Sequence, residues 1–169
     1  WEVRGPRRHF THSKVMAWVA ADRAIKLAQS FGLEGPVEKW KALRRQIHDD
    51  VCAKAFNAER GAFVQSYGAD TLDASVLLMP LVGFLPVTDP RVRDTVEAIE
   101  RSLTAKGFVL RYDTERADDG LPPGEGAFLA CSFWLADCLL MLGRIADARR
   151  LFERLTDLCN DVGLLAEEY

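Results

Sequence analysis

The stretch GEGAFLACSFWLADCLLMLGRIADARRLFERLTDLCNDVG, residues 124–163, contains two kinds of helix in succession. Its first half is apolar on almost every side, which predicts a helix buried all round. Its second half carries charged residues on one face and an apolar stripe on the other, formed by Ile145, Ala148, Leu151, Leu155 and Leu158. Such a stripe predicts a surface helix that packs through one face. The stretch therefore predicts a hairpin with one inner and one outer helix.

The same alternation extends over the rest of the chain. Apolar, inner helices are predicted over residues 11–32 and 70–86, and striped, outer helices over residues 35–56 and 89–107. The fold class is therefore all-α, with six helices in two layers. The inner helix over 11–32 is less uniformly apolar than the other two.

Local signals set the expected ends of these helices. Thr11 or Ser13 should cap the first helix, and Gly32 should end it. Pro36 suits the first position of the second helix. Pro80 should kink or end the third helix, because proline cannot donate a backbone hydrogen bond.

Composition excludes several functional classes. The 169 residues are 49% hydrophobic and 28% charged, which is typical of a globular domain. A net charge of −3 argues against nucleic acid or an anionic membrane as the main partner, and no apolar run is long enough to span a membrane. The chain shows no signal peptide, which favours the cytoplasm, although it opens on Trp1 rather than on Met. Four cysteines without CxxC spacing are expected to be reduced, mainly core residues.

Two small clusters are weak candidates for other chemistry. The stretch RGPRRH, residues 4–9, could bind a phosphate, but the chain as a whole is acidic and the cluster has no interleaved aromatic residues. His9 and His12 lie three residues apart with no acidic or cysteine partner in the pattern, which is weak evidence for a metal site. No cofactor is expected.

The loops that follow the three outer helices resemble one another. They read GAFVQSY from Gly61, GFVLRY from Gly107 and GLLAEEY from Gly163, which indicates one helical hairpin per repeat. In a stack of such hairpins, the three long loops should lie at one end, where binding and catalytic groups commonly sit. One interpretation is a non-catalytic helical-repeat interaction module. Against it, the loops differ in their polar residues, with an arginine in one and two carboxylates in another.

Several segments together resemble glycoside hydrolase family 15, the glucoamylase-like family that includes bacterial glucoamylases, glucodextranases and some trehalases. The segments are, in family order, WEVRG…HFTHSKVMAW, LDASVLLMPLVGF, RY, GEGAFLACSFWLAD and GLLAEEY. The resemblance implies an (α/α)6 toroid of twelve helices, of which this chain would supply six. Residues 1–169 would then be a single partial domain, and the missing half of that domain would be its partner.

The resemblance also implies catalytic roles for two glutamates. Glu2 matches the general acid and Glu167 the general base of the family, with Glu168 as the alternative base. Packing of Trp1 against Glu2 in an enclosed pocket would raise the pKa of the acid. Trp1 and Glu168 are also expected to contact substrate.

Further residues are expected to bind the sugar. Arg111 and Tyr112 match the family's Arg-Tyr pair, in which the arginine hydrogen-bonds glucose hydroxyls. Asp73 and Glu125 each fit a carboxylate at the start of an inner helix, and Glu125 could also touch sugar. Because the segment before the first helix begins at the end where the long loops lie, Glu2, Arg111 and Glu167 are expected to share a surface.

These residues suit an inverting hydrolysis, in which one carboxyl protonates the leaving oxygen and the other activates a water, with the two carboxyl groups roughly 6.5–9.5 Å apart. The expected function is an exo-acting glycosidase that releases glucose from α-glucans or α-linked glucosides. An α,α-trehalase of the same family is the alternative. The interaction module remains the rival from another class.

Overall fold

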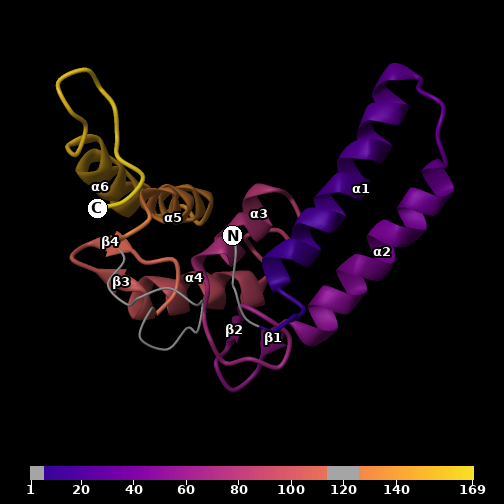
Figure 1. The fold of residues 1–169 in the computed structure, drawn as a ribbon, viewed down its shortest axis with the longest axis horizontal. Coiled ribbons are helices and arrows are strands. Elements are labelled where there is room, and N and C mark those ends of the chain that lie inside the picture. Colours follow the sequence, from indigo (N-terminus) through magenta and orange to yellow (C-terminus); the bar gives the residue numbers. More distant parts are fainter. Residues whose placement is uncertain (1–5, 114–125) are drawn as a thin grey trace.

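The computed structural model describes residues 6–113 and 126–169 (Figure 1). The helices are α1 (Thr11–Phe31), α2 (Val37–Lys54), the 3-10 helix η1 (Ala74–Leu77) that continues into α3 (Leu78–Leu81), α4 (Pro90–Ser102), α5 (Leu129–Met141) and α6 (Ile145–Thr156). Two small antiparallel sheets pair β1 (Phe56–Asn57) with β2 (Ala62–Phe63) and β3 (Thr104–Ala105) with β4 (Phe108–Val109). The mostly helical class is confirmed.

The helices form three hairpins whose inner members are neighbours. Helix α1 packs on α2, η1 packs on α4, and α5 packs on α6. The central segment η1 contacts both α1 and α5, so α1, η1 with α3, and α5 form the inner layer. Helices α2, α4 and α6 lie outside this layer, as the alternating patterns predicted.

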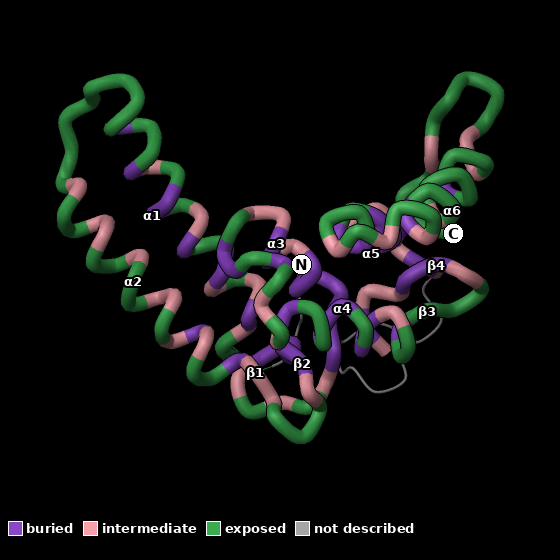
Figure 2. Tube along the Cα trace, turned by 180° about the vertical axis from the view of Figure 1, so that it is seen from behind, coloured by how far each residue is buried: buried purple, intermediate pink, exposed green. Residues whose placement is uncertain are grey.

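Burial follows the two layers unevenly (Figure 2). All four residues of η1 are buried, and the stripe of α4 is buried at Val92, Val96 and Ile99. Helix α2 buries only Val51 of its predicted stripe. The distal part of the α1–α2 hairpin is therefore largely exposed.

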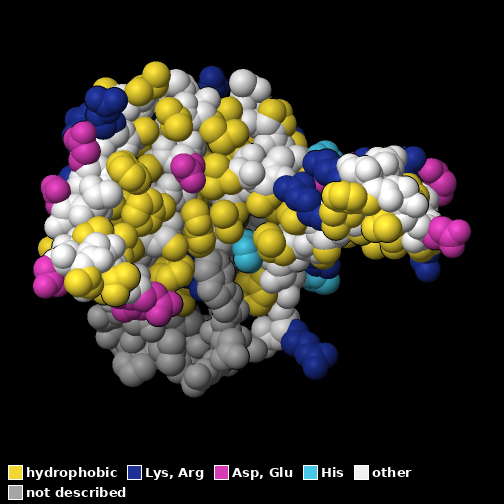
Figure 3. Space-filling model, turned by 90° about the horizontal axis from the view of Figure 1, so that it is seen from above, with side chains coloured by type: hydrophobic (Ala, Val, Ile, Leu, Met, Phe, Trp, Pro, Cys, Tyr) yellow, Lys and Arg dark blue, Asp and Glu magenta, His cyan; other side chains and the backbone are white. Residues whose placement is uncertain are grey.

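Helix α5 is not buried all round, contrary to the sequence pattern. Leu140 and Met141, at its C-terminal end, are 55% and 46% exposed. Ile145 and Phe152 of α6 are also exposed. Figure 3 shows hydrophobic side chains spread over one face of the molecule. The described residues supply no element that covers this end of the hairpin.

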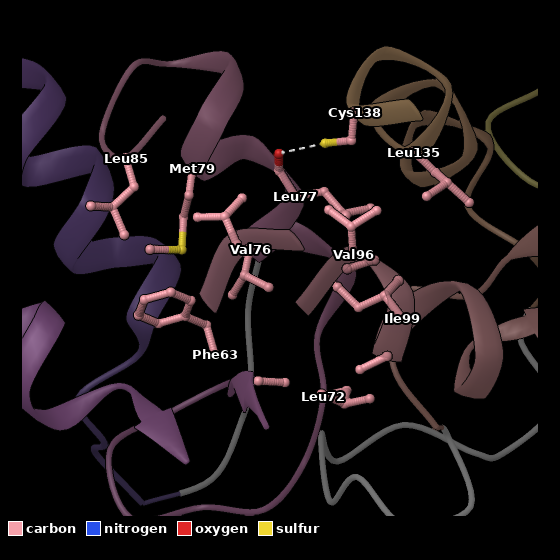
Figure 4. Packing of buried hydrophobic residues seen from close by; sticks show 14 of the residues in the cluster. Phe63, Leu72, Val76, Leu77, Met79, Leu85, Val96, Ile99, Leu135 and Cys138 are labelled. Atoms are coloured by element: carbon pink, nitrogen blue, oxygen red, sulfur yellow. Dashed lines mark hydrogen bonds between the residues drawn. The ribbon is translucent and has the colours of Figure 1, made fainter. Parts of the chain in front are cut away.

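The main core lies around η1, α3 and α4 (Figure 4). Phe63 from β2, Leu77 from η1 and Ile99 from α4 are fully buried there. The buried Cys138 thiol donates a hydrogen bond to the Leu77 carbonyl at 3.3 Å, and burial raises its pKa to about 12. All four cysteines are free, with Cys131 and Cys138 buried and the other two half-buried.

The third helix is much shorter than the pattern predicted. The chain reaches Asp73 in extended conformation, turns through η1 and ends α3 at Leu81, one residue after Pro80. Gly83 then adopts a left-handed φ of 79°, and the Phe84 N–H returns to the Met79 carbonyl. Proline and glycine together thus end the helix, as Pro80 indicated.

The cap expected at Thr11 or Ser13 is wrong, because Phe10 precedes the helix and makes no side-chain cap. The Thr11 hydroxyl instead donates to the Val64 carbonyl at 2.6 Å, which fastens α1 to the loop after α2. Gly32 ends α1 in the left-handed region as predicted, and Pro36 directly precedes α2. Within the described ranges, no helix is both long and apolar enough to cross a membrane.

Candidate active site

Each loop that follows an outer helix returns to the start of its own inner helix. In all three hairpins, a loop carbonyl accepts a hydrogen bond from the first helical N–H. The pairs are Thr11 N–H to Gln65 O (2.9 Å), Ala74 N–H to Arg111 O (2.6 Å) and Leu129 N–H to Glu167 O (3.0 Å). Gln65, Arg111 and Glu167 therefore occupy equivalent positions, which confirms the internal repeat.

The three loops also begin alike. Gly61, Gly107 and Gly163 all adopt left-handed φ angles, of 62°, 86° and 77°. In the first two loops this glycine turns a short β-hairpin that the sequence did not reveal. In the third loop the Asn160 side chain organises the turn, and its Oδ1 accepts from the N–H groups of Val162 and Leu164.

The third loop holds the two candidate base residues. Phe128 forms a β-bridge with Glu168, as Phe10 does with Ser66. Neighbouring residues of an extended segment point to opposite sides, so Glu167 and Glu168 face different ways. Glu167, rather than Glu168, occupies the position equivalent to Arg111.

The end of this loop passes very close to the chain before α5. Ala127 and Tyr169 exchange two backbone hydrogen bonds, at 3.0 and 3.1 Å. A Cβ atom on Gly126 would lie 2.4 Å from the Tyr169 carbonyl oxygen. Glycine is therefore required for this approach.

Asp73 joins the first two loops. Its Oδ1 accepts from the Ser75 N–H at 2.9 Å and so caps η1, as a carboxylate at this position was expected to do. Its Oδ2 accepts from Gln65 Nε2 at 3.2 Å, and its Oδ1 lies 3.7 Å from Arg111 Nε. The Arg111 guanidinium also lies over the Tyr112 ring, 5.5 Å from its centroid.

His12 belongs to the same polar group. It is half-buried in the first turn of α1. Burial lowers its pKa, Asp73 acts in the opposite direction and Arg111 lowers it further. The imidazole is therefore neutral near pH 7. The described residues contain no group of three or more His, Cys, Asp or Glu that could hold a metal ion.

The second and third loops are also in contact. The rings of Phe108 and Tyr169 lie 4.9 Å apart, and the Val109 N–H donates to Ser132 of α5 at 2.8 Å. With Asp73 linking the first loop to the second, the loops form one continuous row. We call this row, residues 61–67, 107–112 and 163–169, the rim.

The rim holds only part of the predicted site. Arg111 and Tyr112 lie on its second loop, and Glu167 and Glu168 on its third. Trp1, Glu2 and Glu125 lie outside the described residues. Sequence reasoning recognised Asp73 only as a helix-start carboxylate and missed its contacts with Gln65 and Arg111, which join residues far apart in the chain.

Solved structures with the same arrangement of helices are glycosidases. A wild-type glycosidase aligns with a TM-score of 0.82 at 19% identity, over 96% of this chain and 42% of its own. A glycosidase variant in complex with glucose aligns with a TM-score of 0.83 at 18% identity, over 98% and 43% of the two chains. The fold therefore matches a little under half of these glycosidase chains.

The family follows from the sequence as a whole. The model of glycosyl hydrolases family 15 matches residues 1–169, and the chain belongs to this family. A trehalase of Mycolicibacterium smegmatis is 49% identical over 168 residues, which are 99% of this chain and 25% of that protein. A trehalase of Thermoplasma acidophilum is 39% identical over 168 residues, 29% of its length. The chain thus spans about a quarter of the length of the curated relatives it matches.

Proposed function

We propose that the protein to which these residues belong is an α,α-trehalase. The observation that carries this proposal is the agreement among relatives. Six of them, 32–49% identical over nearly the whole chain, are trehalases. The preference drawn from the sequence, an α-glucan first and trehalose second, is therefore reversed.

In this proposal, Glu2 and Glu167 act on opposite faces of one glucose unit. Glu2 gives its proton to the bridging oxygen as the bond from that oxygen to the anomeric carbon breaks. Glu167 takes a proton from the water that attacks the same carbon from the other side. Inversion at one carbon of α,α-trehalose yields one β-glucose and one α-glucose.

The equivalence of the rim positions supports Glu167 as the base. Arg111 and Glu167 are each anchored by a backbone hydrogen bond of the same kind, from the first N–H of the inner helix to the loop carbonyl. Their side chains therefore leave the rim from corresponding places. Arg111 and Tyr112 would bind glucose hydroxyls between the two carboxyl groups. Glu168, Trp1 and Glu125 would complete the contacts with the sugar.

The test is an assay of the full-length protein on trehalose, maltose, isomaltose and dextrin. We expect kcat/KM to be highest for trehalose, with equal amounts of the two glucose anomers in early proton NMR spectra. A higher kcat/KM for maltose or dextrin would restore the glucan preference. Hydrolysis of none of the four would favour the interaction module.

Variants of the same protein test the roles. Glu2→Gln and Glu167→Gln should each lower kcat about 100- to 10,000-fold, because each removes a proton-transfer group. Glu168→Gln is the comparison at the neighbouring carboxylate: it should retain most of kcat, and the loss of its sugar contact should appear in KM. An inactive Glu168 variant beside an active Glu167 variant would move the base by one residue.

A further inference from the structure

Asp73 is a buried carboxylate at the junction of three elements. It is 4% exposed, it directly precedes η1, and it contacts the first and second rim loops. A charge buried to this degree is costly unless it is paired and hydrogen-bonded. Here two donors and one cation meet that need, namely the Ser75 N–H, the Gln65 amide and the Arg111 guanidinium.

Capping alone does not explain this arrangement. An asparagine, serine or threonine at position 73 would cap η1 as well as an aspartate does. The charge is required only for the contact with Arg111, whose Nε lies 3.7 Å away. The Tyr112 ring bounds the guanidinium at its face, so the arginine is held at its edge by Asp73 and at its face by Tyr112.

The neighbours of Asp73 considered below are uncharged near pH 7, except for Arg111. From α1 it faces His12, whose pKa is lowered, so that this ring is neutral near pH 7. From α5 it faces Cys131, a thiol whose pKa is raised to about 12, mainly by burial and also by the charge of Asp73. Gln65 on the first loop is uncharged. Among these neighbours, only Arg111 is charged near pH 7.

We propose that Asp73 is a positioning residue, which fixes the Arg111 guanidinium at the rim so that it can bind a glucose hydroxyl. This inference rests on the proposed sugar-binding role of Arg111. Asp73 itself would not touch the substrate. It would act by holding the arginine in one orientation before the sugar arrives, which lowers the entropic cost of binding.

The test is Asp73→Asn in the full-length protein. The asparagine Oδ1 still caps η1, and the Gln65 amide can turn over to accept from Asn Nδ2, so the main loss is the pairing with Arg111. We expect KM for trehalose to rise about tenfold, the scale of one lost charge-assisted contact. The value of kcat should change less than about threefold, because the arginine binds ground state and transition state alike.

The matched control is Asp22→Asn. Asp22 is also a buried carboxylate paired with arginines, but it lies between α1 and α2 and contacts no rim residue that the structure describes. The Asp22→Asn variant should have a lower melting temperature and an unchanged KM. If Asp73→Asn fails to fold, Asp73→Ser takes its place, because a serine also caps η1. The same changes in KM and kcat are then expected.

A double-mutant cycle separates the possible outcomes. Arg111→Ala should raise KM by itself, and adding Asp73→Asn to it should change KM less than about twofold, since the two residues act as one unit. An unchanged KM in Asp73→Asn, or a full additional effect in the double variant, overturns the positioning role. An unchanged KM in Arg111→Ala overturns the sugar-binding role as well.

Discussion

At the scale of single residues, Asp22 shows how a buried charge can fix two helices. Its side chain is 3% exposed and pairs with Arg23 and Lys26 of α1 and with Arg44 of α2. Arg23 also donates to the Val82 carbonyl at the end of α3. Burial alone would raise the pKa of Asp22, but the hydrogen bonds from these cations together outweigh burial, and the pKa is lowered.

We expect Asp22→Asn to lower the free energy of unfolding by about 2–3 kcal/mol near pH 7, because the buried position loses its charge-assisted hydrogen bonds from Arg23, Lys26 and Arg44. A lowered folded-state pKa stabilises the protein above the unfolded pKa of 3.8, and this contribution is lost as the pH falls through the folded value. Urea unfolding at several pH values measures the difference in the free energy of unfolding between the parent and Asp22→Asn. This difference should be constant above about pH 5 and should shrink below about pH 4.

The matched control for stability is Glu38→Gln. Glu38 pairs with Lys41 on the surface of α2, and its side chain is 84% exposed. Solvent screens such pairs, so this variant should unfold like the parent. A pH-independent difference for Asp22→Asn would show that packing, rather than charge, accounts for its effect.

Gly126 gives a second test at the residue scale. Gly126→Ala places a Cβ against the Tyr169 carbonyl, so the third loop must shift and carry Glu167 with it. A displacement of about 1 Å can cost up to about 100-fold in rate, and kcat on trehalose should fall accordingly.

The control for this change is Gly32→Ala. Gly32 ends α1 in a left-handed conformation, and a Cβ added there would have nothing within 4 Å. It should cost about 1–2 kcal/mol of stability through backbone strain and leave kcat unchanged. Equal kcat values in the two variants would show that the position of the third loop does not matter for catalysis.

At the scale of elements, the rim loops differ in what shapes them. Two are β-hairpins with strands of two residues each, too short for any alternation to appear in the sequence. The third relies on a side chain, Asn160, whose Oδ1 accepts two backbone N–H groups. The recurrence of glycine and tyrosine revealed that the loops are related, but not these local structures.

We expect Asn160→Ala to loosen the third loop. Hydrogen exchange at Val162 and Leu164 should become faster, and kcat should fall as Glu167 loses its fixed position. Asn57→Ala is the matched control, because Asn57 Oδ1 accepts from the N–H groups of Glu59 and Arg60 in the turn just before the first loop. It should speed exchange there only. Unaltered exchange in both variants would contradict a structural role for these amides.

The sequence predicted the elements better than their lengths and contacts. Periodicity identified six helices and their layers, since burial on one face leaves a pattern within a short window. It overestimated the third helix, because an apolar run does not distinguish helix from a buried extended segment. The Asp73–Arg111 pairing left no pattern, because it joins separate segments through tertiary structure alone.

At the scale of the whole molecule, two helical hairpins expose several apolar residues each. Leu27, Phe31 and Leu33 lie at the far end of the α1–α2 hairpin, and Leu140, Ile145 and Phe152 lie on the α5–α6 hairpin. Together with the charged outer faces, they make these two hairpins the parts of the molecule best suited to further packing.

We therefore expect residues 1–169, expressed alone, to self-associate and to release no glucose from trehalose. Replacing Leu140 and Phe152 with glutamate should reduce the association, because it introduces charge into one of the two regions. Sedimentation velocity and a glucose assay provide the measurements. A monodisperse, cooperatively melting monomer with turnover would instead identify the 169 residues as a complete catalytic unit.

The way the rim loops are fastened has a consequence for how such a protein can change over time. The anchoring bond uses the loop residue's backbone carbonyl, which every amino acid possesses, so this bond places no demand on the side chain. The three equivalent positions thus carry an amide at Gln65, a guanidinium at Arg111 and a carboxylate at Glu167. New chemistry can be tried at any of the three by a single codon change, without rebuilding the scaffold that presents it.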